Sequence, residues 1–122
     1  MIVGYYPGWD SGFVDDAIKD LKRDGQRKKA AAKLEFDLQM LVSTWPLPKL
    51  VTVSSMKGRE PLRELSREYQ GIAYRVFFCV KDDEIWLLHS IEKKTRKTPG
   101  ADLDLAHTRM KNVLSGKVRR IE

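Results

Sequence analysis

One arginine and one basic run suggest chemistry on a negatively charged substrate. Arg75 lies inside the apolar segment 74–80, where an unpaired charge would be costly to bury. Its partner is either an acidic side chain, Glu64 or Glu92, or a bound anion. A second apolar segment, 84–92, leads directly into the basic run 93–97. The candidate anion-binding residues are Lys57, Arg59, Arg63, Arg67, Arg75, Lys93, Lys94, Arg96 and Lys97.

The sequence gives little indication of a metal site, a nucleotide-binding site or a nucleophilic catalytic residue. His89 and His107 stand far apart without companion cysteines, and their surroundings match no metal-binding motif, so no metal site is expected. No phosphate-binding loop, dinucleotide fingerprint or serine-nucleophile motif is present. The single cysteine, Cys79, sits among apolar strand residues and is expected to pack as a small hydrophobe.

The elements that position these residues follow from the apolar spacing. Strands are predicted at 2–6, 62–68, 72–80 and 84–92, with 50–56 irregular or briefly extended. Helices are predicted from about 13 to 24, with Asp10 or Ser11 as the cap, and from 26 to 42. A last helix is predicted to begin at Pro99, with Thr98 at its N-cap. We therefore expect one α+β domain, residues 1–122. It would hold an antiparallel sheet of about four strands, with an N-terminal helical hairpin and a C-terminal helix on one face.

Composition narrows the class of partner. The 122 residues contain 23 Lys and Arg against 17 Asp and Glu, a formal charge of +6, which favours nucleic acid, an acidic protein or an anionic surface. No apolar run approaches the ~20 residues of a membrane helix, and the first residues do not resemble a signal peptide. A cytoplasmic protein without a membrane partner is expected.

Several short motifs resemble the RelE/ParE toxin superfamily, and within it the HigB-type branch of phage-derived proteins. They are Glu64-Leu65, Tyr74-Arg75-Val76, the run 93–99 (KKTRKTP), Ala106 and Arg109. The resemblance implies a small RelE-like fold and a ribosome-dependent messenger-RNA endonuclease that uses no metal or cofactor. It also implies a cognate antitoxin, typically a helix-turn-helix protein.

By this resemblance, Arg75 and Lys94 are the catalytic candidates. The residues expected to hold RNA are Lys57, Arg63, Lys93, Arg96 and Lys97. One departure concerns Glu64 and Ser66, because RelE-type relatives carry catalytic lysines at these two strand positions. Neighbouring strand residues point to opposite faces, so Arg63 and Arg67 do not replace Ser66.

The proton-transfer groups are therefore open. Histidine titrates near neutrality, which makes His89 and His107 candidates. However, His89 shares strand parity with Leu87, Ile91 and Lys93, so we expect a structural histidine on the core face. His107 is expected to be an ordinary surface residue. Two further functions stay open, a non-enzymatic ParE-like topoisomerase inhibitor and a toxin-like binding module that has lost cleavage.

Overall fold

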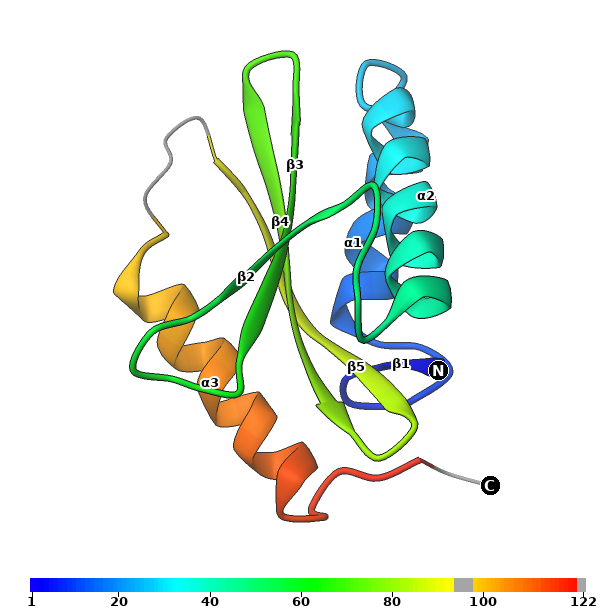
Figure 1. Cartoon of the computed structure of the whole chain (residues 1–122). Helices are drawn as coiled ribbons and strands as arrows, with labels where there is room; N and C mark the ends of the chain where they lie inside the picture. The colour runs from blue at the N-terminus through cyan, green and yellow to red at the C-terminus, as the bar shows by residue number, and fades with distance from the viewer. Residues whose placement is uncertain (94–97, 121–122) are drawn as a thin grey trace.

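The computed structural model describes residues 1–93 and 98–120, and it shows a mixed α+β fold in which one sheet lies between helices (Figure 1). The predicted residues Lys94, Arg96 and Lys97 lie outside the described residues. The elements in chain order are β1 (Ile2–Tyr5), α1 (Phe13–Arg23), α2 (Lys28–Thr44), β2 (Thr52–Ser55), β3 (Arg63–Tyr69), β4 (Ile72–Lys81), β5 (Glu84–Lys93) and α3 (Gly100–Leu114).

The sheet has five strands in the order β1-β5-β4-β3-β2, so the prediction of about four was too low. The additional strand, β2, pairs with β3 where the sequence predicted irregular or short extended structure. Only four residues long and mostly exposed, β2 lacks the apolar alternation by which a strand is recognised. The prediction of an antiparallel sheet was also wrong at one edge, because β1 runs parallel to β5.

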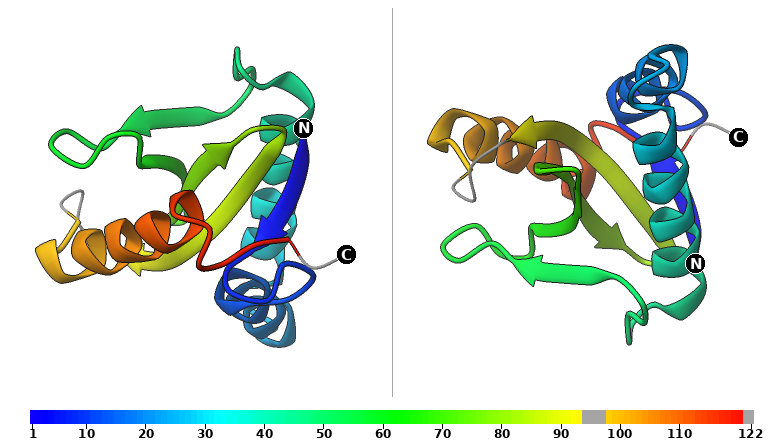
Figure 2. Two further views of the ribbon diagram at one scale, coloured as in Figure 1. Left: turned by 90° about the horizontal axis from the view of Figure 1, so that it is seen from below. Right: turned by 90° about the horizontal axis from the view of Figure 1, so that it is seen from above.

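Helices cover both faces of the sheet, which corrects the expectation that they share one face. The two views of Figure 2 show α1 and α2 on one side of the strands and α3 on the other. The cause is the composition of β4, which is apolar on both faces. Val76 and Phe78 belong to the core under α1 and α2, whereas Phe77 and Cys79 belong to the core under α3. Each apolar face needs its own cover.

The entry into α1 also differs from the prediction. Gly12 occupies the N-cap position, and neither Asp10 nor Ser11 forms a capping hydrogen bond. The chain instead makes a tight loop in which the Phe13 amide donates to the Tyr6 carbonyl at 3.0 Å. Gly12 is required in this loop, since a Cβ atom there would lie 2.1 Å from the Tyr6 oxygen.

The helix α3 begins one residue later than predicted, with Pro99 at the N-cap position in place of Thr98. The buried strand residues agree with the prediction. Cys79 is fully buried, as expected. Leu62 and Leu65 are both buried, on opposite faces of the sheet. Among the described residues, no helix combines the length and apolar character that crossing a bilayer requires.

Candidate functional site

The candidate site lies on the face of the sheet that α3 partly covers, near the start of that helix. The strand register defines two rows of side chains on this face. One row runs Ser66–Arg75–Ile91 and the next runs Glu64–Phe77–His89, from β3 through β4 to β5. The site therefore combines a cation, a carboxylate and an imidazole on three adjacent strands.

Arg75 is paired with Glu64. The Arg75 Nη1 donates to Glu64 Oε1, and the two side chains are only 13% and 4% exposed. Of the alternatives that the sequence left open, the internal ion pair with Glu64 is therefore present. Glu92 lies on the other face, where it contacts Arg27. A mostly buried pair of this kind holds both charged groups in fixed positions, because each would be costly to bury alone.

His89 faces α3, on the same side of the sheet as Ile91 and Lys93, as strand parity predicts, but on the opposite side from Leu87. The β4–β5 register shifts at Phe77/Phe78, so that Phe77 pairs with His89 while Phe78 pairs with Leu87. Leu88 is the extra residue, and such a bulge reverses the alternation of the residues that follow it. Sequence alternation alone carries no signal for this shift.

The imidazole of His89 is held from two directions. Its Nε2 lies 2.8 Å from Asp102 Oδ1 on α3, and its ring stacks on Phe77 at 6.1 Å between centroids, with 16° between planes. The His89 and Asp102 side chains are 16% and 28% exposed. Sequence reasoning missed Asp102 as a partner of His89, because only the packing of α3 on β5 brings the two together.

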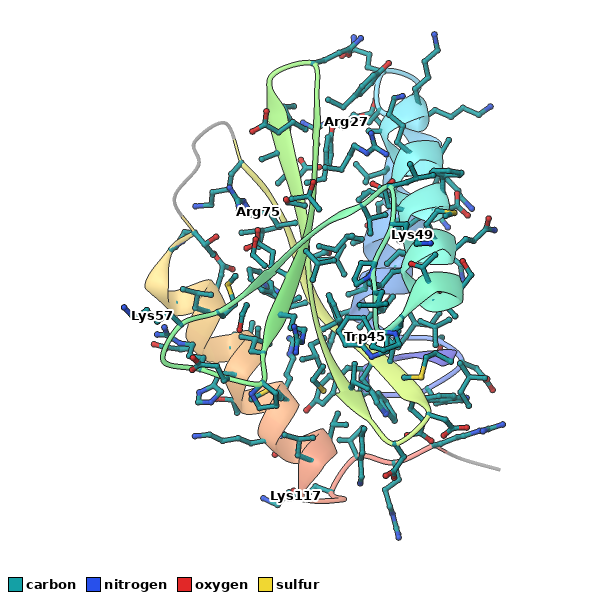
Figure 3. The ribbon with its side chains drawn as sticks, in the orientation of Figure 1. Arg27, Trp45, Lys49, Lys57, Arg75 and Lys117 are labelled. Atoms are coloured by element: carbon teal, nitrogen blue, oxygen red, sulfur yellow. The ribbon has the colours of Figure 1, made fainter. Side chains whose placement is uncertain are left out.

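Three of the other predicted residues lie in different parts of the structure. Lys93 ends β5 on the same face as Arg75, since its register partner Ala73 stands two residues before Arg75. Lys57 is exposed in the β2–β3 loop and points outward beside α3 (Figure 3). Arg63 lies on the opposite face, with its guanidinium 5.1 Å from the Trp45 ring, so the structure does not bring it together with Arg75.

The β2–β3 loop and α3 are joined next to this face. Arg59 Nη2 donates to Asp104 Oδ1 at 2.7 Å. The Arg67 guanidinium, in contrast, points to the opposite face and pairs with Asp37 of α2, with Nε at 2.7 Å from Oδ2. The parity prediction that neither Arg63 nor Arg67 replaces Ser66 is therefore confirmed.

A cleft of about 370 Å³ opens on the other face, between α1 and strands β4 and β5. Its charged lining residues are Asp20, Asp24 and Glu92 together with two arginines, Arg27 and Arg75. Within the described residues, no group of three or more metal-ligating side chains comes together.

Comparison with known protein families gives a match over most of the chain. The family model described as "Phage derived protein Gp49-like (DUF891)" matches residues 17–111, which include α2, strands β2 to β5, the Arg75–Glu64 pair, His89 and Asp102. No curated protein and no solved structure matches the chain significantly. The matched segment covers most of the chain and every residue of the candidate site. This chain therefore belongs to the Gp49-like family of phage-derived proteins, a family of RelE/toxin-like proteins.

Proposed function

We propose that this chain is the toxin of a type II toxin–antitoxin system, a ribosome-dependent endoribonuclease that cleaves messenger RNA without a metal ion. Family membership supports the toxin-like character. The observation that carries the enzymatic part is the Arg75–Glu64 pair, a fixed cation beside a carboxylate on an incompletely covered sheet face.

The proposed reaction is an internal transesterification of RNA. The 2′-hydroxyl attacks the adjacent phosphorus and loses its proton to the Glu64 carboxylate. Arg75 stabilises the negative charge that develops on the phosphoryl oxygens, which is the largest catalytic effect usually available to such a site. Arginine suits this task because its planar guanidinium presents donors along several edges to carboxylate and phosphate oxygens. The products are a 2′,3′-cyclic phosphate and a 5′-hydroxyl.

The proposed RNA path follows the end of β5. Lys93 lies on the Arg75 face, and the sequence continues with Lys94, Arg96 and Lys97. Lys94 is the proposed second catalytic cation, a role that rests on the sequence resemblance alone. A cognate antitoxin of helix-turn-helix type is the proposed partner, and an acidic segment in it would complement the basic run.

The test is induction of the chain in growing cells, with mapping of messenger-RNA 5′ ends. Wild type is expected to arrest growth and fragment translated messages. Arg75→Ala is expected to reduce cleavage by about 10²-fold or more, the loss typical for a preorganised charge-stabilising donor. Arg23→Ala, which removes the same charge from an exposed position on α1, is the control and is expected to cleave normally.

Folding is controlled by a second variant. Arg75→Ala leaves Glu64 buried and unpaired, so the double variant Arg75→Met with Glu64→Gln removes both charges and keeps similar volumes. A folded double variant that cleaves like wild type would contradict the proposal. Growth arrest with intact messages and inhibited DNA supercoiling would instead indicate a topoisomerase inhibitor.

A further inference from the structure

The His89–Asp102 pair lies beside the Arg75–Glu64 pair and has the arrangement of a proton-transfer group. Asp102 contacts Nε2 of the imidazole at 2.8 Å, so Nδ1, on the other edge of the ring, is the nitrogen that can exchange a proton with a ligand. Phe77 fixes the plane of the ring by stacking. A histidine oriented by a carboxylate and partly open to solvent suits general acid–base chemistry.

The spacing of the three strands suits the geometry of the proposed reaction. Glu64 and His89 both pair with Phe77, from opposite sides, so their Cα atoms stand two strand spacings apart, or ~10 Å. Arg75 lies between them in the neighbouring row. In-line displacement at phosphorus needs a base and an acid on opposite sides of the phosphate. Glu64 and His89 occupy such positions around the cation.

The position of His89 depends on the bulge at Leu88, and Arg109 of α3 supports that bulge. The Arg109 Nη1 donates to the Leu88 carbonyl at 2.8 Å. Its guanidinium also lies over the Phe13 ring at 4.2 Å and the Tyr6 ring at 5.5 Å, and burial lowers the pKa of this group. With regular alternation, His89 would share a face with Leu87 and point into the core under α1 and α2.

We infer that His89, oriented by Asp102, is the general acid of the proposed RNA cleavage, and that Arg109 is the positioning residue that keeps His89 on the site face. The inference rests on the proposed function. In the step, the P–O2′ bond forms as Glu64 takes the 2′-hydroxyl proton. The P–O5′ bond breaks as the His89 imidazolium gives its Nδ1 proton to the 5′-oxygen. Exchange with solvent then returns both groups to their starting states.

Other ionisable groups lie on the same side of the sheet as His89 and would contribute to the pH dependence of the cleavage rate. Asp102 faces it from α3, while Arg75 of β4 and Glu64 of β3 lie on the same face of the sheet. Arg109 holds the adjacent backbone, and the Arg59–Asp104 pair joins the β2–β3 loop to α3. A pH–rate profile alone therefore reflects the ionisation of all these side chains and not of His89 alone. The test instead changes the leaving atom of the substrate.

The probe is a short messenger RNA in a reconstituted translation reaction, prepared with either oxygen or sulfur at the 5′-bridging position of the mapped cleavage site. Sulfur is a good leaving group that needs no acid. His89→Gln is expected to slow cleavage of the oxygen substrate by about 10²-fold or more, the usual contribution of general acid catalysis. The sulfur substrate is expected to be cleaved by His89→Gln at close to the wild-type rate.

Matched variants separate chemistry from folding. Glu64→Gln is expected to slow both substrates, because it acts on the 2′-hydroxyl. His107→Gln replaces the chain's second histidine, which lies on α3, and is expected to leave the cleavage rates of both substrates unchanged. Arg109→Met is expected to resemble His89→Gln, with loss on oxygen and recovery on sulfur, whereas a purely structural role would lower both rates equally.

The outcomes distinguish the two proposals. If wild type cleaves neither substrate, the proposed function fails. If wild type cleaves the RNA but His89→Gln does so equally well, or if sulfur does not restore its rate, His89 is not the general acid and the proposed function stands. If Arg109→Met lowers the rates on both substrates together, Arg109 does not act by positioning His89.

Discussion

The ion pair between Arg67 and Asp37 is expected to contribute strongly to stability, although it lies away from the candidate site. Asp37 is a carboxylate in the middle of α2 and its side chain is 2% exposed. Arg67 of β3 meets it with two donors, Nε and Nη2, and is 30% exposed. The pair ties α2 to β3 on the face opposite Arg75, so its loss can be studied without touching the site.

Arg67→Met leaves the Asp37 carboxylate buried without its cation. Breaking a buried ion pair in this way costs about 3–5 kcal/mol, and we expect the lower end because water partly reaches Arg67. For a chain of this length, about 3 kcal/mol corresponds to a fall of roughly 12 °C in Tm. Urea unfolding followed by far-UV circular dichroism measures the loss as a lower midpoint at an unchanged slope.

Two further variants sharpen this test. Arg63→Met removes the other arginine on the same strand and face, whose guanidinium lies over the Trp45 ring, and it is expected to cost only about 0.5–1 kcal/mol. The double variant Asp37→Leu with Arg67→Met removes both charges and is expected to recover most of the stability. An Arg67→Met protein as stable as Arg63→Met would refute the reasoning.

Three other predictions concern the packed core. Gly4→Ala would place a Cβ atom 1.9 Å from Trp9 Cε3, so we expect overpacking to lower the free energy of unfolding in urea by ~3 kcal/mol. Gly25→Ala is the control and should be nearly neutral, because nothing lies within 4 Å of its added Cβ atom. Burial raises the pKa of the Cys79 thiol from 9.0 to about 12. At pH 8 the folded chain therefore contains roughly 1,000-fold less thiolate than the unfolded chain. The reaction of Cys79 with a thiol reagent should be slower by the same factor in the folded chain and should recover when urea unfolds it. Because the folded pKa is the higher one, this thiol's contribution to stability is complete below about pH 9 and is lost as the pH rises toward 12. Wild type should therefore lose more stability than Cys79→Ala between pH 8 and 10, and equal losses would contradict this reading.

Sequence patterns predicted most of the secondary structure, because they reflect local conformational preferences and the burial of apolar side chains. The three helices and the strands at β1, β3, β4 and β5 follow from apolar periodicity, and Arg75 stood out because a charge inside an apolar strand needs a partner. Glu64 was among the two partners considered. The burial of Cys79 and the opposite orientation of Arg63 and Arg67 relative to Ser66 also follow from strand alternation alone.

Tertiary structure decided the features that depend on neighbours distant in the chain. The choice of Glu64 over Glu92 came from which face each strand presents. The parallel pairing of β1 with β5 brings together segments far apart in the sequence, such as Ile2 and Glu84. The bulge at Leu88 reversed the orientation of His89, and its support comes from Arg109, twenty-one positions along the chain. Alternation fixes the direction of a side chain only while the strand stays regular. A one-residue shift is stabilised by contacts from another element, so the residues near His89 could not reveal it.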